Sequence, residues 1–237
     1  MDDAVDRALR AIRSTEIADD DLSEPFQRAV PVGGVSVSSF GSIVASETIS
    51  ATDDTAFRVD EIQFDLAEGP CWTALRHRAP VLEGDIVGNP NREWPAFNDA
   101  VRAESVRAVF AFPIVFGPFP LGAVDIYSPR PTELGGAQVE AAAALADALG
   151  RRVLRRAIRS AQDEDEALVD QNPFSRRVVH QATGVVLAQL DVTPEDAYLL
   201  IQGHAFARRT PMRQVAEEIL AGTVRFEKHG DLIEEVR

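Results

Sequence analysis

The sequence has very little cysteine, almost no lysine and no long apolar run. Its single cysteine, Cys71, cannot form an intramolecular disulfide, and no group of cysteine and histidine residues has the spacing of metal ligands. No apolar run approaches the ~20 residues that cross a bilayer. The acidic start Met1-Asp2-Asp3 also differs from the basic start of a signal peptide. We therefore expect a cytoplasmic chain with no metal, no other cofactor and no membrane partner.

Negative charge dominates the chain but is unevenly distributed. The formal net charge is -14, and 237 residues suffice for one or two domains with a sizeable core. Residues 1–150 hold 11 basic and 24 acidic side chains, whereas residues 151–237 hold 13 basic and 14 acidic ones. A nucleic-acid backbone would therefore meet strong repulsion everywhere except in the last third of the chain.

Residues 172–222 contain three segments in which apolar residues recur at helical spacing. The second segment opens with Thr193 and Pro194; the threonine can cap the first turn, and proline suits the first helical position. The third segment opens in the same way, with Thr210-Pro211. Short amphipathic helices with tight connections predict a three-helix bundle.

Four stretches of this region form a recognisable pattern: Gln181-Ala182-Thr183-Gly184-Val185-Val186, Glu195-Asp196-Ala197-Tyr198, His204-Ala205-Phe206-Ala207 and Met212-Arg213-Gln214-Val215-Ala216. The pattern resembles the ANTAR domain, a three-helix RNA-binding module of bacterial antitermination regulators. Many family members have a basic residue where this chain has Thr183, and an arginine where it has Gln202. The resemblance implies RNA stem-loops as partners, and an RNA-binding surface formed by Ala182, Thr183, Gly184, Gln202, His204, Arg208 and Arg209.

Residues 22–136 alternate irregularly between strand and helix patterns. Strand-like segments occur near residues 32–38 and 43–51 and again near 107–115 and 121–127, so that a hairpin is expected at each end of the region. Helical patterns lie between the two hairpins. This order predicts an α+β fold in which helices flank an antiparallel sheet.

Two motifs in this region are Gln63-Phe64-Asp65-Leu66-Ala67-Glu68-Gly69-Pro70-Cys71 and Gly122-Ala123-Val124-Asp125-Ile126-Tyr127. They resemble a GAF domain of the kind that precedes ANTAR modules in actinobacteria. The resemblance covers roughly residues 22–150. It implies a sensor of an unknown small molecule that also dimerises, with a pocket between the sheet and the loops above it.

Five residues are candidates for a ligand or redox site. Cys71 begins a short helix, where a thiol can be reactive, but a free cysteine can equally be a small buried residue. Aromatic residues can line a pocket or simply fill the core; the candidates are Trp72, Trp94, Phe112 and Tyr127. Asp85 and Asp125 could act as an acid/base pair only if they lie close together. Because no catalytic motif is found, we predict that the chain is not an enzyme.

Residues 137–171 read as one long connector helix. A helix of about 30 residues is ~45 Å long, which is too long for one small sheet to cover. We therefore expect its second half to pair with another helix, from this chain or from a second copy in a homodimer. A basic stripe on this helix could extend an RNA surface or form a solvated face paired with acidic residues, which we favour; it comprises Arg151, Arg152, Arg155, Arg156 and Arg159.

The remaining segments are an N-terminal helix with an acidic linker, residues 1–21, and a charged tail, residues 223–237, expected to be partly helical or frayed. Our first hypothesis is a signal-responsive RNA-binding antitermination regulator that senses a small molecule or a redox state. The alternative is a sensor whose terminal bundle has lost RNA affinity and instead mediates dimerisation or docking to a partner. Thr183 and Gln202, which supply no positive charge, keep this alternative open.

Overall fold

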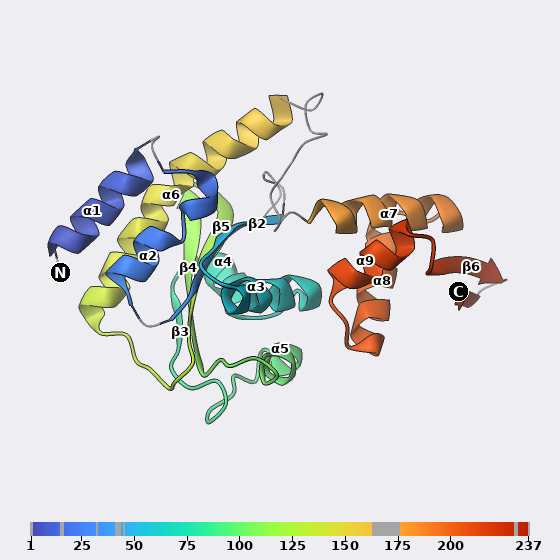
Figure 1. The fold of residues 1–237 in the computed structure, drawn as a ribbon, viewed down its shortest axis with the longest axis horizontal. Helices are drawn as coiled ribbons and strands as arrows, with labels where there is room; N and C mark the ends of the chain where they lie inside the picture. Colours follow the sequence, from blue (N-terminus) through green and yellow to red (C-terminus); the bar gives the residue numbers. More distant parts are fainter. Residues whose placement is uncertain are drawn as a thin grey trace. The chain divides into compact units, whose positions relative to one another are not determined.

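The computed structural model describes residues 2–14, 17–31, 33–40, 44, 46–162, 176–229 and 232–236. The chain divides into two compact units, residues 1–174 and 175–237 (Figure 1). Among the helices described, none combines the length and the apolar character that a membrane span requires.

The first unit is built on a five-stranded antiparallel sheet, as the sequence predicts. The strands are ordered β2-β1-β5-β4-β3. The central hairpin of β4 and β5 turns at Gly117, whose φ of 57° lies in the left-handed region that glycine readily adopts. The strands are β1 Val35–Ser39, β2 Glu47–Ala51, β3 Val81–Glu83, β4 Ala108–Phe116 and β5 Phe119–Ser128.

One face of the sheet is apolar and is covered by α1 (Asp2–Arg13), α2 (Glu24–Ala29) and α6 (Gly136–Gln162) (Figure 1). Alternate strand residues point into this layer, because successive side chains of a strand face opposite ways. The buried residues include Val35, Val37, Phe110, Phe112, Ile114, Val124 and Ile126, together with Leu145 and Leu149 of α6.

The opposite face carries α3 (Asp54–Leu66), α4 (Pro70–His77) and α5 (Pro95–Val101) (Figure 1). Asp53 caps α3, because its carboxylate accepts the backbone N–H of Ala56 at 2.8 Å. Part of this layer is polar: Ser36 and Ser38 of β1 are buried beneath the helices that cover this face. The polar layer is where the first unit departs from a simple apolar core.

The N-terminal helix and α6 belong to the core of the first unit. We expected residues 1–21 to lie outside the sensor domain, but Ala8 and Ile12 of α1 are buried in the same cluster as Val153 of α6. Helix α1 of the same chain therefore packs against the part of α6 that contains Val153. The expected continuation of α6 to residue 171 lies outside the described residues.

The second unit contains the three predicted helices, α7 (Arg177–Leu190), α8 (Pro194–Arg208) and α9 (Met212–Leu220). Thr193 caps α8 as predicted, since its hydroxyl accepts the backbone N–H of Asp196 at 3.2 Å. Apolar residues at helical spacing meet in one core: Val179, Ala182, Val186, Leu190, Ala197, Ile201, Ala205, Met212, Val215, Ala216 and Ile219.

The C-terminal tail differs from our expectation of partly helical or frayed structure. It forms an antiparallel hairpin of β6 (Arg225–His229) and β7 (Leu232–Val236). Phe226 of β6 is buried against the three-helix core, which explains why a charged segment is ordered there.

Candidate functional site

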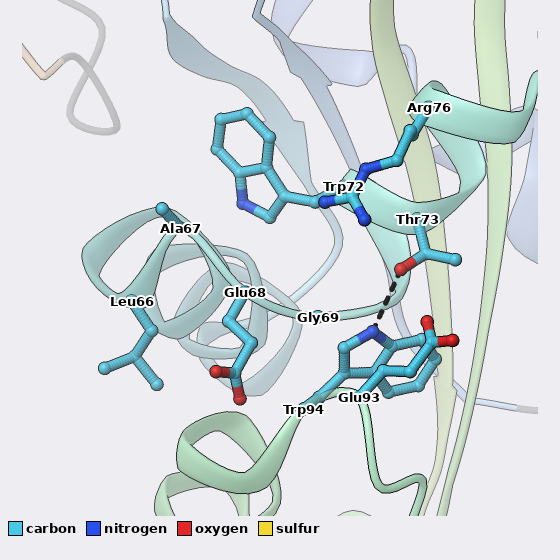
Figure 2. Close-up of a pocket in the computed structure, with 9 residues that line it drawn as sticks. All are labelled: Leu66, Ala67, Glu68, Gly69, Trp72, Thr73, Arg76, Glu93 and Trp94. Carbon is cyan, nitrogen blue, oxygen red and sulfur yellow. Dashed lines mark hydrogen bonds between the residues drawn. The ribbon is translucent and has the colours of Figure 1, made fainter.

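A cavity of about 230 Å³ lies where the end of α3, the start of α4 and the segment before α5 meet. The indole rings of Trp72 and Trp94 lie on two sides of it, and charged side chains complete the wall (Figure 2). Its lining comprises Leu66, Ala67, Glu68, Gly69, Trp72, Thr73, Arg76, Glu93 and Trp94.

The pocket depends on how the chain passes from α3 to α4. Gly69 has a φ of 132°, and a Cβ there would lie 2.8 Å from Gln63 Cγ and Oε1, so only glycine fits without rearrangement. Gln63 then holds the start of α4 in place. Its side-chain oxygen accepts the N–H of Cys71 at 2.8 Å, and its backbone oxygen accepts the indole N–H of Trp72 at 2.8 Å.

The pocket is mostly polar and carries charges of both signs. Trp94 is buried, and its indole N–H donates to Thr73 Oγ1 at 2.9 Å. Glu68 accepts the backbone N–H of Phe97 at 2.9 Å, while Arg76 and Glu93 are exposed. This combination suits binding of a small polar molecule with a planar part.

The five predicted ligand or redox residues do not form one site. Only Trp72 and Trp94 line the pocket. Cys71 is fully buried in a cluster with Phe40, Phe64 and Ala123, which agrees with the structural alternative and not with an accessible thiol. Two aromatic residues were wrongly placed in the pocket: Phe112 lies on the opposite face of the sheet, towards α6, and Tyr127 donates its hydroxyl to Asp53 at 3.1 Å.

Two buried carboxyl groups lie between the sheet and α3. Asp60 accepts the hydroxyl of Ser38 at 2.6 Å and also that of Thr48, and Asp125 accepts the side-chain amide of Gln63 at 3.0 Å. Burial raises the pKa of Asp125 well above its ordinary value, and the nearby charge of Asp60 raises it further. Sequence reasoning missed Asp60, although the polar residues at positions 60 and 63 share one face of α3 and are both buried.

Asp85, which the sequence suggested as a partner of Asp125, has another role. Its carboxylate accepts a hydrogen bond from Arg107 Nη2 at 2.9 Å and one from the backbone N–H of Gly88 at 3.0 Å. These hydrogen bonds, with that of Gly88 the strongest, lower the pKa of Asp85. Asp85 therefore stabilises a loop, and the carboxyl group that influences Asp125 is that of Asp60.

In the second unit, Gly184 lies on the exposed side of α7. Among the residues that the structure describes, a Cβ added there would meet no heavy atom within 4 Å, apart from the helix's own nearby backbone. The neighbouring Thr183 is half-buried, and its hydroxyl donates to the backbone oxygen of Val179 at 2.8 Å. Ala182 was wrongly placed on the nucleotide-facing surface, because it is fully buried in the bundle core.

The predicted RNA-binding residues of α8 differ in how available their side chains are for contact with an external molecule. Arg208 Nη2 donates to Glu218 Oε1 at 3.1 Å, and this pairing lowers the pKa of Glu218. The His204 ring packs edge-on against Phe226, with ring centres 5.5 Å apart. Gln202 is half-buried, and Arg209 is exposed at the end of α8. Of these residues, Arg209 is the clearest candidate for an external contact.

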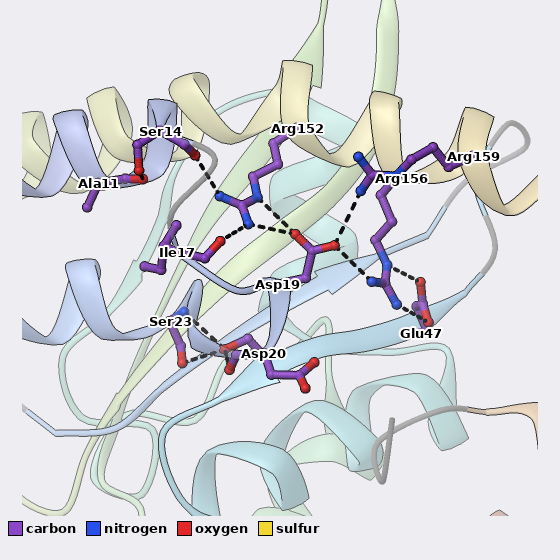
Figure 3. Close-up of polar contacts among 11 residues, drawn as sticks. Ala11, Ser14, Ile17, Asp19, Asp20, Ser23, Glu47, Arg152, Arg156 and Arg159 are labelled. Atoms are coloured by element: carbon purple, nitrogen blue, oxygen red, sulfur yellow. Dashed lines mark hydrogen bonds and ion pairs between the residues drawn. The ribbon is translucent and has the colours of Figure 1, made fainter. Parts of the chain in front are cut away.

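The basic stripe of α6 pairs with acidic residues, as we favoured, but Arg152 and Arg156 lie in a largely buried cluster and not on a solvated face. Asp19 pairs with Arg152 at 2.8 Å and with Arg156 at 3.0 Å, and Glu47 pairs with Arg156 at 2.9 Å (Figure 3). Arg159 lies 3.7 Å from Asp19. The cluster joins α6 to the short 3₁₀ turn η1 (Asp19–Asp21) and to β2.

Comparisons with known proteins agree with this division. A family model for the GAF domain matches residues 3–153, and one for the ANTAR domain matches residues 173–220. A search of curated proteins gave no match.

Solved structures support the fold of the first unit. The GAF domain of a phosphoenolpyruvate-protein phosphotransferase from Acinetobacter is 11% identical, with a TM-score of 0.50; the match covers 72% of this chain and 96% of that chain. The corresponding domain from Coxiella burnetii is also 11% identical, with a TM-score of 0.50 and coverage of 67% and 95%. Identity this low shows the fold alone. Together with the family models, it establishes that the chain belongs to the GAF domain family and that an ANTAR domain follows its GAF domain.

Proposed function

We propose that this chain is a signal-responsive transcription antitermination regulator that binds RNA stem-loops through its ANTAR domain. The observation that carries the proposal is the exposed Gly184 in the middle of α7. Glycine there costs about 1 kcal/mol relative to alanine, and no atom of the described residues packs against that side of the helix so as to require it. A close approach by an external molecule, such as an RNA backbone or base, would explain why glycine occupies this position.

The GAF domain would sense a small molecule in the pocket between α3, α4 and α5. Arg76 and the carboxylates of Glu68 and Glu93 can orient a polar ligand beside the partly exposed ring of Trp72. A volume of about 230 Å³ suits a compact molecule, since pockets for drug-sized ligands are about 300–1,000 Å³. The ligand can regulate RNA binding only if it binds one arrangement of the protein better than another.

Two ANTAR domains joined in a homodimer would bind a pair of stem-loops. The bundle, residues 172–222, has five arginines and five acidic residues, so its electrostatic attraction for RNA is modest. Linking two such domains makes the second binding event intramolecular and raises the overall affinity without any new contact.

The alternative, docking to a protein partner, draws support from the internal pairing of Arg208 with Glu218. A cation neutralised in this way contributes little to the attraction of phosphate groups. The two functions predict different responses to salt, because release of counterions from RNA makes its binding weaken as salt increases.

The test is fluorescence anisotropy of the full chain with labelled RNA that carries two stem-loops, titrated with salt. We expect affinity that falls with salt and depends on the identity of the loop bases. Gly184→Gln, which places a long side chain on the exposed face, should weaken binding at least about tenfold, the effect of losing ~1.4 kcal/mol. Gly136→Gln is the matched control, because Gly136 is exposed in the first unit and is equally free of neighbours. No binding at low salt would instead support the docking function.

A further inference from the structure

The strongest unexplained surface feature of the second unit is an apolar line along α8. Leu199 and Phe206 are 53% and 64% exposed, and Gly203 lies between them. Residues spaced by four and three positions lie on one face of a helix, so these three form a continuous line. Phe206 is the most exposed of the large apolar residues that the structure describes.

The packing of the chain does not account for this line. Within the described part of the chain, a Cβ added at Gly203 would meet no heavy atom within 4 Å, beyond the helix's own nearby backbone. Glycine also weakens a helix relative to alanine. The side chains that hold α8 in the bundle lie elsewhere on the helix and are Ala197, Ile201 and Ala205. An exposed aromatic ring beside a bare stretch of helix is therefore available to an external partner.

Charge indicates the chemistry of that partner. Gln202 and Arg209 lie four residues before and three residues after Phe206, on adjoining parts of the helix surface. The guanidinium of Arg209 is exposed and makes no hydrogen bond or ion pair with the part of the chain that the structure describes. The acidic residues of α8, Glu195 and Asp196, lie at the opposite end of the helix. A flat apolar group attached to an anionic group would fit beside Phe206.

We propose that Phe206 is a stacking platform for an unpaired base of an RNA loop, with Gly203 leaving room for the nucleotide and Arg209 contacting a neighbouring phosphate. This inference rests on the proposed RNA-binding function. Proteins commonly read RNA loops by stacking splayed bases on aromatic side chains. A second protein chain fits the feature less well, since two large apolar side chains supply far less than the ~1,000 Å² that a specific protein interface buries.

The test measures the affinity of the full chain for RNA with two stem-loops. Phe206→Ala should weaken binding by about 10- to 100-fold, the effect expected for losing one aromatic–base stack. Phe206→Tyr should restore affinity to within about threefold of the unsubstituted chain, because it retains the stacking ring. Leu220→Ala is the control, because Leu220 is 42% exposed on α9 and lies outside the line.

A second measurement assigns the effect to one base. RNAs with a single abasic position in the loop are titrated against the unsubstituted chain and Phe206→Ala. At the stacked position the loss from Phe206→Ala should disappear, because the partner of the ring is already missing. Phe206→Gln serves as a second variant, and circular dichroism checks that both fold.

Three results would overturn the proposal. If the unsubstituted chain binds RNA and Phe206→Ala behaves like Leu220→Ala, the stacking role fails while the proposed function stands. If Phe206→Ala abolishes self-association in light scattering without changing the affinity of each protomer for RNA, the occupant of this face is a second copy. If the unsubstituted chain does not bind RNA at all, the proposed function fails and the inference fails with it.

Discussion

The ion-pair cluster around Asp19 provides a sharp test of how α6 is held to the first unit. Asp19→Ala removes the carboxylate that accepts hydrogen bonds from Arg152 Nε at 2.9 Å and Arg156 Nη1 at 3.0 Å (Figure 3). Arg156 keeps Glu47 as a partner, whereas Arg152 is left with backbone oxygens alone. The loss of stability should therefore come mainly from the charge of Arg152, which no longer has a carboxylate partner.

The burial of the two side chains determines how much stability Asp19→Ala should cost. The Asp19 and Arg152 side chains are only 18% and 12% exposed. Exposed ion pairs contribute about 0.2–1 kcal/mol, whereas breaking a fully buried pair costs about 3–5 kcal/mol. We expect an intermediate loss of about 2–3 kcal/mol, corresponding to a fall in Tm of about 4–12 °C for a unit of this size.

The assay is urea unfolding followed by tryptophan fluorescence, which reports the first unit alone because both tryptophans, Trp72 and Trp94, lie there. Asp3→Ala is the control: it removes a pair with Arg7 in which both side chains are more than half exposed, and it should cost less than about 1 kcal/mol. If Asp19→Ala costs no more than Asp3→Ala, the cluster does not hold α6 in place.

The pH dependence of stability tests the same cluster independently. Burial alone would raise the pKa of Asp19, but the hydrogen bonds and charges of Arg152 and Arg156 lower it below its ordinary value of 3.8. The stabilisation is therefore present above that value and is lost as the pH falls through the lowered pKa. The difference in stability between the unsubstituted chain and Asp19→Ala should accordingly shrink in acid.

Three further substitutions test other parts of the fold. Gly69→Ala should destabilise the first unit by about 1–3 kcal/mol in urea unfolding, because its backbone conformation suits glycine and a Cβ would clash with Gln63; an unchanged midpoint would contradict this. Asp125→Asn should gain stability relative to the unsubstituted chain as the pH rises above about 4. The raised pKa of Asp125 makes the folded chain retain a proton that the unfolded chain releases, and a pH-independent difference would refute this. Thr193→Ala should lower the stability of the second unit by about 1 kcal/mol in circular dichroism melts, through loss of the cap of α8.

Local features of the fold were predictable from the sequence because their causes are local. Asp53 and Thr193 each cap a helix whose first residues follow directly in the chain. The bundle helices followed from apolar spacing, and the antiparallel sheet from strand patterns separated by turns. These signals act within a few residues, so neighbours in the sequence suffice to reveal them.

Features that depend on distant residues were not predictable. Arg152 finds its partner 133 residues away in Asp19, and no short pattern encodes that pairing. Phe112 points towards α6 because strand residues alternate between faces, and the sequence does not reveal which face carries the pocket. The same limitation applied to the polar layer under α3, because Asp60 of α3 and Asp125 of β5 approach one another only when the helix packs on the sheet.

In the bundle, the family pattern did not separate buried from exposed positions. Ala182 and Gly184 are two residues apart in the same motif, yet one fills the core and the other faces outward. The tail hairpin added a further contact, since Phe226 packs against His204 and reduces its exposure to an external ligand. Phe206, which the pattern contains but sequence reasoning did not select, emerged only from its exposed fraction.

The predicted homodimer through α6 now has a specific test. The sheet and α1 of the same chain cover most of the apolar residues of α6. A second copy could therefore contact only the outer edge of the helix, which carries Arg151, Arg155 and Ile158. Ile158 is 49% exposed. Ile158→Asp places a charge on this edge without disturbing the core, so the fold should be unchanged in circular dichroism. If two α6 helices meet there, sedimentation equilibrium should show the dimer weakened at least about tenfold, the effect of losing ~1.4 kcal/mol. A dimer of unchanged strength would place the interface elsewhere, because Ile158→Asp replaces an apolar contact by a carboxylate that loses water when the interface forms.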